Sequence, residues 1–356
     1  MTKQRNSSNQ EVASPGYSVF VGIDISAKTA DIAVLTDVKD KSNKGKVWKI
    51  KQTNSGYTSL LKRLDKFIPV RSEVFILMES TGAYWRKLAQ FLDSSGYTVC
   101  VVNPLRAHYF AKSLINRDKT DAMDAMMLAK MGYSTYQLLP IWSAPPPIAD
   151  KISQLLHQRD NLTHMSVQRS NRRHAFDHHI EEPLPAVIER DEELRFKISQ
   201  QIRRIDKELK ILIREDEAYY KTFKYLMSVD GIGVVTACWL IYVTQNFAES
   251  MFVDVRNLAS LIGLVPRTFE SGTSIRKQSK IGHSGQPRLR QLLYTASMSA
   301  VQNNPRMQGF YDRLVEKGKP KKSAYIAVAH KLLYVCWAVA KKQEYFDRNY
   351  HLQDAS

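Results

Sequence analysis

The chain has 356 residues, of which 52 are Lys or Arg and 35 are Asp or Glu, so its formal net charge at pH 7 is +17. Hydrophobic residues make up 44% and charged residues 24%, which is ordinary for globular proteins and excludes collagen-like, mucin-like and wholly disordered chains. The length predicts two or three domains. The excess of positive charge predicts a polyanionic partner, of which nucleic acid is the commonest kind.

Neither a membrane anchor nor a disulfide framework is expected. The first fifteen residues are polar and lack the apolar core of a secretory signal. The most apolar stretch, 326–340, is interrupted by a histidine and a lysine and is shorter than the roughly 20 residues that span a bilayer. Cys100, Cys238 and Cys336 lie far apart among apolar neighbours, which is typical of reduced core thiols. We therefore expect a cytoplasmic protein with no membrane partner.

The first part of the chain predicts an α/β domain over residues 17–145, after a polar and disordered tail at 1–16. Helices are expected at 57–67 and 84–92. Strands are expected at 18–24, 31–35, 47–51, 74–78 and 98–102. Three strands that look antiparallel, followed by alternating helices and strands, predict a sheet with mixed strand directions.

A proline cluster at 145–147 indicates a linker, and the region 148–225 after it contains no convincing strand. Near its end, apolar residues are spaced 4, 4, 3, 4 and 3 apart, which predicts a coiled-coil seam. These residues are Leu194, Ile198, Ile202, Ile205, Leu209 and Leu212. Prolines at 183 and 185 separate this helix from an earlier one, so we expect a helical hairpin. The arginines of the first arm are either a solvated face or a nucleic-acid track.

A third region, 226–345, is predicted to be mostly helical and is followed by a tail at 346–356. It opens with Asp230-Gly-Ile-Gly233 before an apolar helix, a pattern typical of a phosphate-binding turn or of a simple tight turn. The segment 267–290 holds six Lys or Arg and one acid, with several serines and glycines. It is predicted to be a long loop that binds phosphate or carries a nucleophilic serine.

Four carboxylates have positions that favour a metal site. Asp24 and Glu79 end predicted strands, and Asp121 and Asp124 lie on a predicted helix that begins after Thr120. The i,i+3 spacing puts the last two on one helix face, with Cβ atoms roughly 5–6 Å apart. Such acids repel one another unless a divalent cation lies near them, and the absence of Cys or His ligands favours Mg²⁺ or Mn²⁺ over zinc. Each acid alone has an ordinary structural explanation, such as the helix dipole.

The order of these motifs resembles one family. Gly22-Ile-Asp24, Glu79-Ser-Thr-Gly-Ala-Tyr84, Asn103-Pro104 and Lys119-Thr-Asp-Ala-Met-Asp-Ala125 are similar to the amino-terminal domain of the DEDD transposases of insertion sequences. These are bridge-RNA-guided recombinases related to pilin-gene invertases. Gly263-Leu-Val-Pro-Arg267, Glu270-Ser-Gly272 and Leu289-Arg290 resemble the family's carboxy-terminal transposase domain. The chain departs from the family at Asp230, where a proline is usual, and at Ile281-Gly-His-Ser-Gly285, where Ile-Ser-Lys-x-Gly is usual.

The resemblance implies an RNase H-like (RuvC-like) domain in which Asp24, Glu79, Asp121 and Asp124 bind Mg²⁺ and are catalytic. It also implies that Ser271 is a nucleophile that forms a phosphoserine link to DNA. A guide RNA, encoded by the element, would pair with donor and target DNA. The coiled coil would form homodimers that assemble into a tetrameric synapse, with each active site composed of two chains.

The expected fold class is therefore α/β plus all-α, with a helical coiled-coil insert between an RNase H-like domain and a mostly helical transposase domain. Three other functions stay open: a metal-dependent nuclease or junction resolvase that uses water, an actin-like or sugar-kinase enzyme, and a non-catalytic nucleic-acid-binding protein. The basic residues assigned to nucleic-acid contacts are Lys28, Arg106, Lys119, Arg169, Arg172, Arg173, Arg267, Arg276, Lys277, Lys280, Arg288 and Arg290.

Overall fold

The computed structural model describes residues 16–36, 45–67, 70–114, 120–179, 181, 184–248, 254–271, 275–281 and 285–347, with only the backbone described in 266–271 and 275–281. Contacts divide the chain into two compact units, 1–144 and 145–356. Nearly all of the predicted tail at 1–16, residue Lys119 and most of the tail at 346–356 lie outside the described residues.

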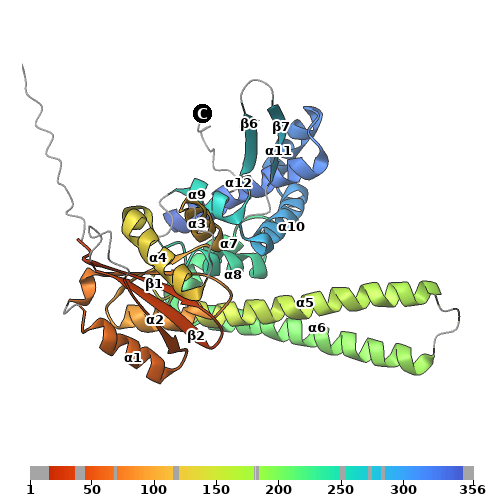
Figure 1. Cartoon of the computed structure of the whole chain (residues 1–356). Coiled ribbons are helices and arrows are strands. Elements are labelled where there is room, and N and C mark those ends of the chain that lie inside the picture. The colour runs from red at the N-terminus through yellow and green to blue at the C-terminus, as the bar shows by residue number, and fades with distance from the viewer. Residues whose placement is uncertain are drawn as a thin grey trace, which may run out of the picture. The chain divides into compact units, whose positions relative to one another are not determined.

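The first unit is built on a five-stranded mixed sheet (Figure 1). The order of its strands is β3-β2-β1-β4-β5. Strand β2 runs antiparallel to β1 and β3, whereas β1, β4 and β5 run parallel to one another. The predicted mixed sheet is therefore confirmed. The bounds of the strands are Val19–Ile25 for β1, Thr29–Leu35 for β2, Lys46–Lys51 for β3, Val74–Glu79 for β4 and Thr98–Val102 for β5.

Helices cover both faces of this sheet. Buried residues of α1 (Asn54–Leu64) and α2 (Trp85–Ser94) form a core with one face, and those of α3 (Pro104–Ser113) and α4 (Asp121–Thr135) form a core with the other. Gly22 of β1 lets α4 pack directly on the strand, because a Cβ atom at Gly22 would lie 1.9 Å from the carbonyl oxygen of Ala125. Short 3-10 turns span Arg71–Glu73 and Tyr136–Leu138.

The second unit begins with two long helices that pack side by side as an antiparallel hairpin, α5 (Pro147–His179) and α6 (Pro185–Arg214) (Figure 1). The predicted helical hairpin is thus confirmed. Within the predicted seam, Ile198, Ile205 and Leu209 are buried inside the single chain, whereas Leu194 is 38% exposed. Much of the seam therefore serves the chain's own core.

The rest of the second unit is a helical core. It contains α7 (Glu217–Met227), α8 (Val234–Val243), α9 (Val255–Ile262), α10 (Pro287–Asn303), α11 (Pro305–Glu316) and α12 (Lys321–Lys342). Helix α12 is long and apolar enough to cross a membrane by length and composition, but half of its most apolar window is buried, and its buried residues belong to this core. All three cysteines are free and buried, as expected, and burial raises the pKa of each thiol to about 12.

The prediction of a long loop at 267–290 was wrong. The backbone forms an antiparallel pair, β6 (Pro266–Ser271) and β7 (Ile275–Ile281), and α10 begins at Pro287. These two strands form a sheet of their own. A ribbon with no larger sheet to join does not need the alternation of apolar and polar residues that identifies a half-buried strand.

Candidate active site

Strand register brings Asp24 and Glu79 together at one end of the sheet, where the carboxyl ends of β1 and β4 lie. Strands β1 and β4 are parallel with Ile23 opposite Met78, so the next residue of each strand lies at the same level. Side chains alternate between the faces of a strand. Asp24 is therefore on the same face as Gly22, which is the face that α4 covers. The two carboxylates that were singled out at predicted strand ends are neighbours in the fold.

Helix α4 begins at this same end of the sheet. Thr120 caps it, since the Thr120 hydroxyl accepts a hydrogen bond of 3.2 Å from the Met123 N–H. The first turn then carries Asp121 and Asp124. Asp121 is exposed and Asp124 is half-buried. The close approach of α4 at Gly22 explains why the first turn reaches the end of β1.

A fifth acid, Asp31, was missed by the sequence reasoning. Asp31 of β2 lies directly opposite Asp24 across the antiparallel pair and is only 8% exposed. The Lys49 ammonium on β3 lies 3.2 Å from the nearer Asp31 oxygen and 3.6 Å from the nearer Asp121 oxygen, so one lysine connects two acids of the cluster. The available indication was an aspartate inside the otherwise apolar strand 29–35.

The electrostatics confirm that the acids act on one another. Burial and the negative charges of four neighbouring acids together raise the pKa of Asp24 from 3.8 to about 6. Burial is the largest cause, followed by Asp124, Asp121, Glu79 and Asp31 in that order. The Glu79 carboxylate also accepts a hydrogen bond of 2.5 Å from the Thr81 hydroxyl. Asp24 is thus the centre of a cluster that has more negative charge than its protein surroundings neutralise.

The donor set suits a hard divalent cation, but the side chains are not arranged as a finished metal site. Carboxylate oxygens are the ligands that Mg²⁺ and Mn²⁺ prefer, and the raised pKa of Asp24 is the effect that a nearby cation would relieve. Among the residues that the structure describes, no group of three or more His, Cys, Asp or Glu side chains could hold a metal ion as it stands.

Ser271 lies at the end of β6, in the second unit, with its backbone paired to Ile275 of β7. The residues between the two strands, 272–274, lie outside the described part of the chain. Four of the predicted nucleic-acid-binding residues are on the same two strands, where Arg267 pairs with Lys280 and Phe269 pairs with Lys277, and Arg276 lies opposite Glu270. Basic residues therefore lie on both strands of the ribbon that ends at Ser271.

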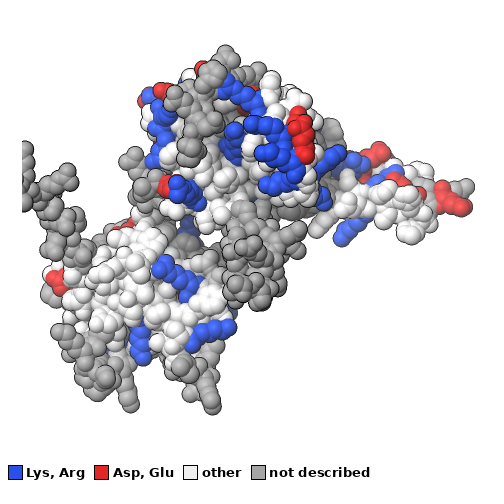
Figure 2. Space-filling view, turned by 90° about the horizontal axis from the view of Figure 1, so that it is seen from above, with Lys and Arg blue, Asp and Glu red and all other residues white. Residues whose placement is uncertain are grey.

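Several of the other predicted nucleic-acid-binding residues have partners within the protein. Arg169 pairs with Asp191, and Arg173 pairs with Asp177, whereas Arg172 on the same helix is exposed. This arm of the hairpin therefore presents fewer unpaired cations than its sequence suggests. Figure 2 shows one face of the molecule, on which Lys and Arg cover more of the described surface than Asp and Glu do.

Of the remaining residues predicted to bind nucleic acid, two lie in the first unit and two in the second. Lys28 is exposed in the turn between β1 and β2, and Arg106 is exposed on α3, where it donates a 3.4 Å hydrogen bond to the Leu138 carbonyl. In the second unit, Arg288 pairs with the buried Asp160, and Arg290 donates to backbone carbonyls at the end of α9. Arg288 and Arg290 thus stabilise their own unit, through an ion pair and through hydrogen bonds to backbone carbonyls.

Three acids of the sheet and two of α4 surround one end of the sheet in a chain with a net charge of +17, which favours an enzyme that acts on nucleic acid. Residues 21–176 match the transposase family model of the DEDD transposases of IS110, and residues 223–312 match the transposase IS116/IS110/IS902 family. The chain is 33% identical to a pilin gene-inverting protein of Moraxella lacunata and 31% identical to that of Moraxella bovis, in each case over 93% of this chain and 98% of the relative. It is also 30% identical, over 34% of its length and 29% of the relative's, to an uncharacterized 43.6 kDa protein of insertion element IS110 in Streptomyces coelicolor.

The chain belongs to the IS110 family of transposases and DNA invertases, and it is a DNA recombinase. This membership argues against the sugar-kinase and non-catalytic alternatives.

Proposed function

We propose that this chain is an RNA-guided DNA recombinase of an insertion sequence, which cleaves and rejoins DNA through a covalent phosphoserine. The observation that carries the proposal is the convergence of acids from β1, β4 and α4 around Asp24. The strand order β3-β2-β1-β4-β5, with β2 antiparallel, supports an RNase H-like domain over residues 17–145. We place the helical dimerisation region at 148–225 and the transposase domain at 226–345.

In this proposal Asp24, Glu79, Asp121 and Asp124 hold Mg²⁺, with Mn²⁺ as a substitute. A divalent cation bound there supplies positive charge for the attacking and leaving oxygens of a phosphoryl transfer. Asp24 carries the raised pKa and gains most from that charge. Asp31 and Lys49 stay outside the ligand set, because the lysine already neutralises Asp31 and holds Asp121 beside it.

The nucleophile in this proposal is the Ser271 hydroxyl. Its oxygen bonds to the phosphorus of a DNA phosphodiester while the bond from phosphorus to the 3′-oxygen breaks. The serine loses its proton, and the departing 3′-oxygen ends as a hydroxyl. The covalent link conserves the phosphodiester until a second 3′-hydroxyl displaces the serine. The basic residues of β6 and β7 would neutralise the phosphates that flank the reacting one.

The partners in this proposal are a guide RNA, donor and target DNA, and further copies of the chain in the cytoplasm of a bacterium or archaeon. Apolar side chains remain exposed on the hairpin, which supports a homodimer formed there and a tetrameric synapse formed from two dimers. Met165 is 47% exposed, Val167 53% and Phe196 58%. Since Arg169 pairs with Asp191, Met165 and Phe196 lie at about the same level of the two arms.

The decisive experiment is to incubate the protein with the RNA that flanks its element, target DNA and Mg²⁺, and to search for protein–DNA adducts after denaturation. We expect an adduct with the unchanged protein and none with Ser271→Ala. Ser284→Ala is a matched control, because this serine lies in the same basic segment and should leave the adduct intact. Cleaved DNA without an adduct would instead support a nuclease or resolvase in which water attacks.

The carboxylates are tested in the same assay. Asp121→Asn and Asp124→Asn should abolish cleavage and leave RNA binding within a few-fold, because each change removes a metal ligand and no nucleic-acid contact. A variant that recombined at the normal rate would remove its residue from the proposed site.

A further inference from the structure

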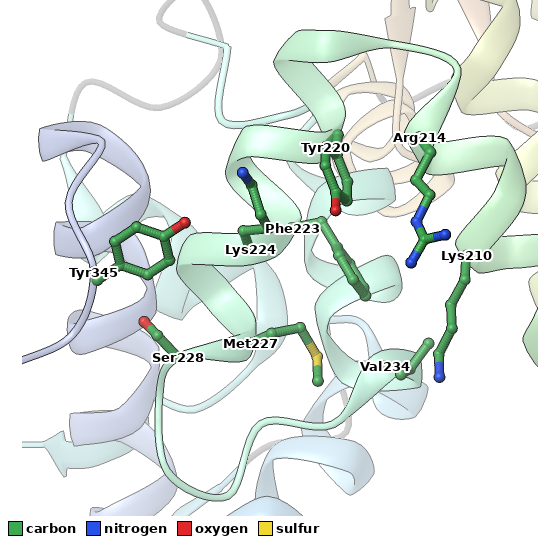
Figure 3. Close-up of a pocket in the computed structure, with 9 residues that line it drawn as sticks. All are labelled: Lys210, Arg214, Tyr220, Phe223, Lys224, Met227, Ser228, Val234 and Tyr345. Carbon is green, nitrogen blue, oxygen red and sulfur yellow. The ribbon is translucent and has the colours of Figure 1, made fainter.

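The second unit contains a pocket that belongs to neither the carboxylate cluster nor the Ser271 ribbon. It is an open cavity of about 430 Å³, between the end of α6, helix α7, the start of α8 and the segment after α12 (Figure 3). Cavities of this size hold small ligands or parts of larger ones. Buried Ile213 and Leu226 lie on the helices that form its walls, so the walls are fixed by the core.

The pocket is positively charged. Lys210 and Arg214 of α6 and Lys224 of α7 line it, and none of the described lining residues is acidic. Lys210 and Arg214 are four residues apart, which places two like charges on one helix face at a cost in helix stability. Of the acids nearby in the sequence, Glu208 pairs with Arg204, Asp216 caps α7 and Glu217 pairs with Lys221, whereas the exposed Glu215 directly follows Arg214 and is not among the lining residues. An anionic ligand would turn this local repulsion into attraction.

The first turn of α8 adds backbone donors at the same place. Val234 is the first residue of α8 and lines the pocket, and the N-cap residue Gly233 makes no side-chain cap. The N–H groups of a first helical turn have no carbonyl partner within the helix. Gly231 fixes this turn against α10, since its φ is +90° and a Cβ atom there would lie 2.5 Å from the Ala296 carbonyl oxygen. Figure 3 shows Lys210 and Arg214 extending from α6 toward the side of the pocket that Val234 forms.

The remaining walls are aromatic. The Tyr220 ring has the Lys224 ammonium 4.8 Å and the Arg214 guanidinium 5.9 Å from its centroid. Tyr345 is 58% exposed and packs edge-on to Tyr225 at 5.2 Å between centroids. The backbone N–H next to it, on Phe346, donates a 2.8 Å hydrogen bond to the Ser228 hydroxyl, which holds this end of the chain against α7. The cations lie over the Tyr220 ring, so the aromatic and the charged groups form one continuous surface of the pocket.

We propose that this pocket binds one nucleotide of an unpaired nucleic-acid strand. Its phosphate contacts Lys210, Arg214 and the first turn of α8, and its base packs on Tyr220 and Phe223. Cations combined with aromatic rings are the chemistry by which single strands are held without sequence readout. In a duplex the base faces are covered by their neighbours, so an unpaired nucleotide is the better fit. The proposal rests on the family's action on nucleic acid, and it needs neither the carboxylates nor Ser271.

The test uses the full chain and fluorescently labelled oligodeoxythymidine, oligouridine and a DNA duplex of the same length. The variant Lys210→Gln with Arg214→Gln should bind a single strand about tenfold more weakly. Its plot of log K against log salt should be shallower by about 0.7, because the two cations contact one phosphate. Arg204→Gln with Lys221→Gln is the matched control. It removes the same charge from α6 and α7 outside the pocket, and it should change binding less than about twofold. The duplex should lose less affinity than the single strands.

A second variant separates stacking from charge. Tyr220→Leu keeps every cation and should weaken single-strand binding about fivefold, with an unchanged salt dependence. Whichever of the two oligonucleotides loses more affinity identifies the strand as RNA or DNA. Three results would overturn the proposal: pocket variants that bind like the control, an equal loss on duplex, or altered sedimentation of the pocket variants, which would make the pocket an interface between copies. The binding assay measures no covalent adduct and changes no residue of the catalytic proposal, so the pocket and the catalytic proposal can fail independently.

Discussion

Asp24 and Asp31 lie directly opposite each other across the antiparallel strands β1 and β2. Like charges at facing positions of a sheet are destabilising, and here the partner acid is 8% exposed. The structure tolerates the pair because Lys49 lies beside Asp31 and because the pKa of Asp24 is raised to about 6, so that its carboxyl is partly protonated near neutrality. A bound cation would reduce the repulsion between these acids, so this end of the sheet is suited to hold one.

The raised pKa of Asp24 predicts a pH-dependent stability. The folded value, about 6, is above the ordinary 3.8, so the contribution of Asp24 to folding is fully present below about pH 4 and is lost as the pH rises through about 6. Since the side chain is only half-buried, we expect a loss of about 1–2 kcal/mol, well below the full value of a two-unit shift. Asp24→Asn should abolish this part of the pH dependence in urea unfolding with EDTA present.

Asp312→Asn provides the control for that measurement, because it removes an exposed acid of the second unit. It should leave the pH dependence as in the unchanged chain. An Asp24→Asn variant with the parental slope between pH 4 and 7 would show that the carboxylate cluster does not strain the fold.

Lys49 is predicted to compete with a bound cation for the acids. The hydrogen bond to Asp31 and the charge of that acid, and then the charge of Asp121, raise the pKa of Lys49, so the lysine remains protonated beside them. Lys49→Gln removes this charge, and Mn²⁺ should then raise the melting temperature by several degrees more than it does in the unchanged chain. Lys51→Gln on the same strand removes the same charge without touching Asp31, and its Mn²⁺ response should be parental. Equal responses in all three proteins would contradict this role.

The Asp160–Arg288 pair connects α5 to α10, and we predict that it stabilises the second unit. Arg288 makes two hydrogen bonds to Asp160, of 2.8 and 2.5 Å, and Asp160 is 8% exposed. Breaking one partner of a buried pair leaves an uncompensated charge, so Asp160→Leu should lower the free energy of unfolding by about 2–3 kcal/mol. The double variant with Arg288→Met should recover part of the loss. Glu208→Gln, which breaks an exposed pair with Arg204, should cost under about 0.5 kcal/mol.

The proposed dimer is tested best at an exposed apolar residue. Ile205 is unsuitable, because it is 3% exposed and belongs to the core of its own chain, so a charge there would unfold the hairpin whatever its oligomeric state. Phe196→Glu should raise the dimer dissociation constant about tenfold or more in sedimentation equilibrium, since it places a charge in an apolar contact. Gln200→Glu adds the same charge at an exposed polar position of α6 and should leave dimerisation unchanged. A Phe196→Glu dimer of parental affinity would exclude this surface.

Local sequence patterns were sufficient to predict many of the helices and strands. Thr120 followed by Asp121 and by helix-forming residues predicted the start of α4, and the structure confirms the cap. The same local reasoning failed at 267–290, because the polar, glycine-rich sequence of the β6–β7 ribbon has no apolar period to detect. Local patterns also could not say which partner the Leu194–Leu212 seam meets, since a heptad pattern describes one helix face and not the helix that covers it.

The sequence by itself determined the types of the acidic residues, their order along the chain and the family to which the chain belongs, because motifs and their spacing are properties of a linear string. Only the tertiary structure decided that Asp31 lies against Asp24, that Lys49 connects Asp31 to Asp121, and which arginines are engaged by acids of the same chain. Strand register and helix packing bring together residues that are far apart in sequence, and they act over distances that no local pattern records. The pocket beside Lys210 and Tyr220 has the same origin, since four separate segments build it.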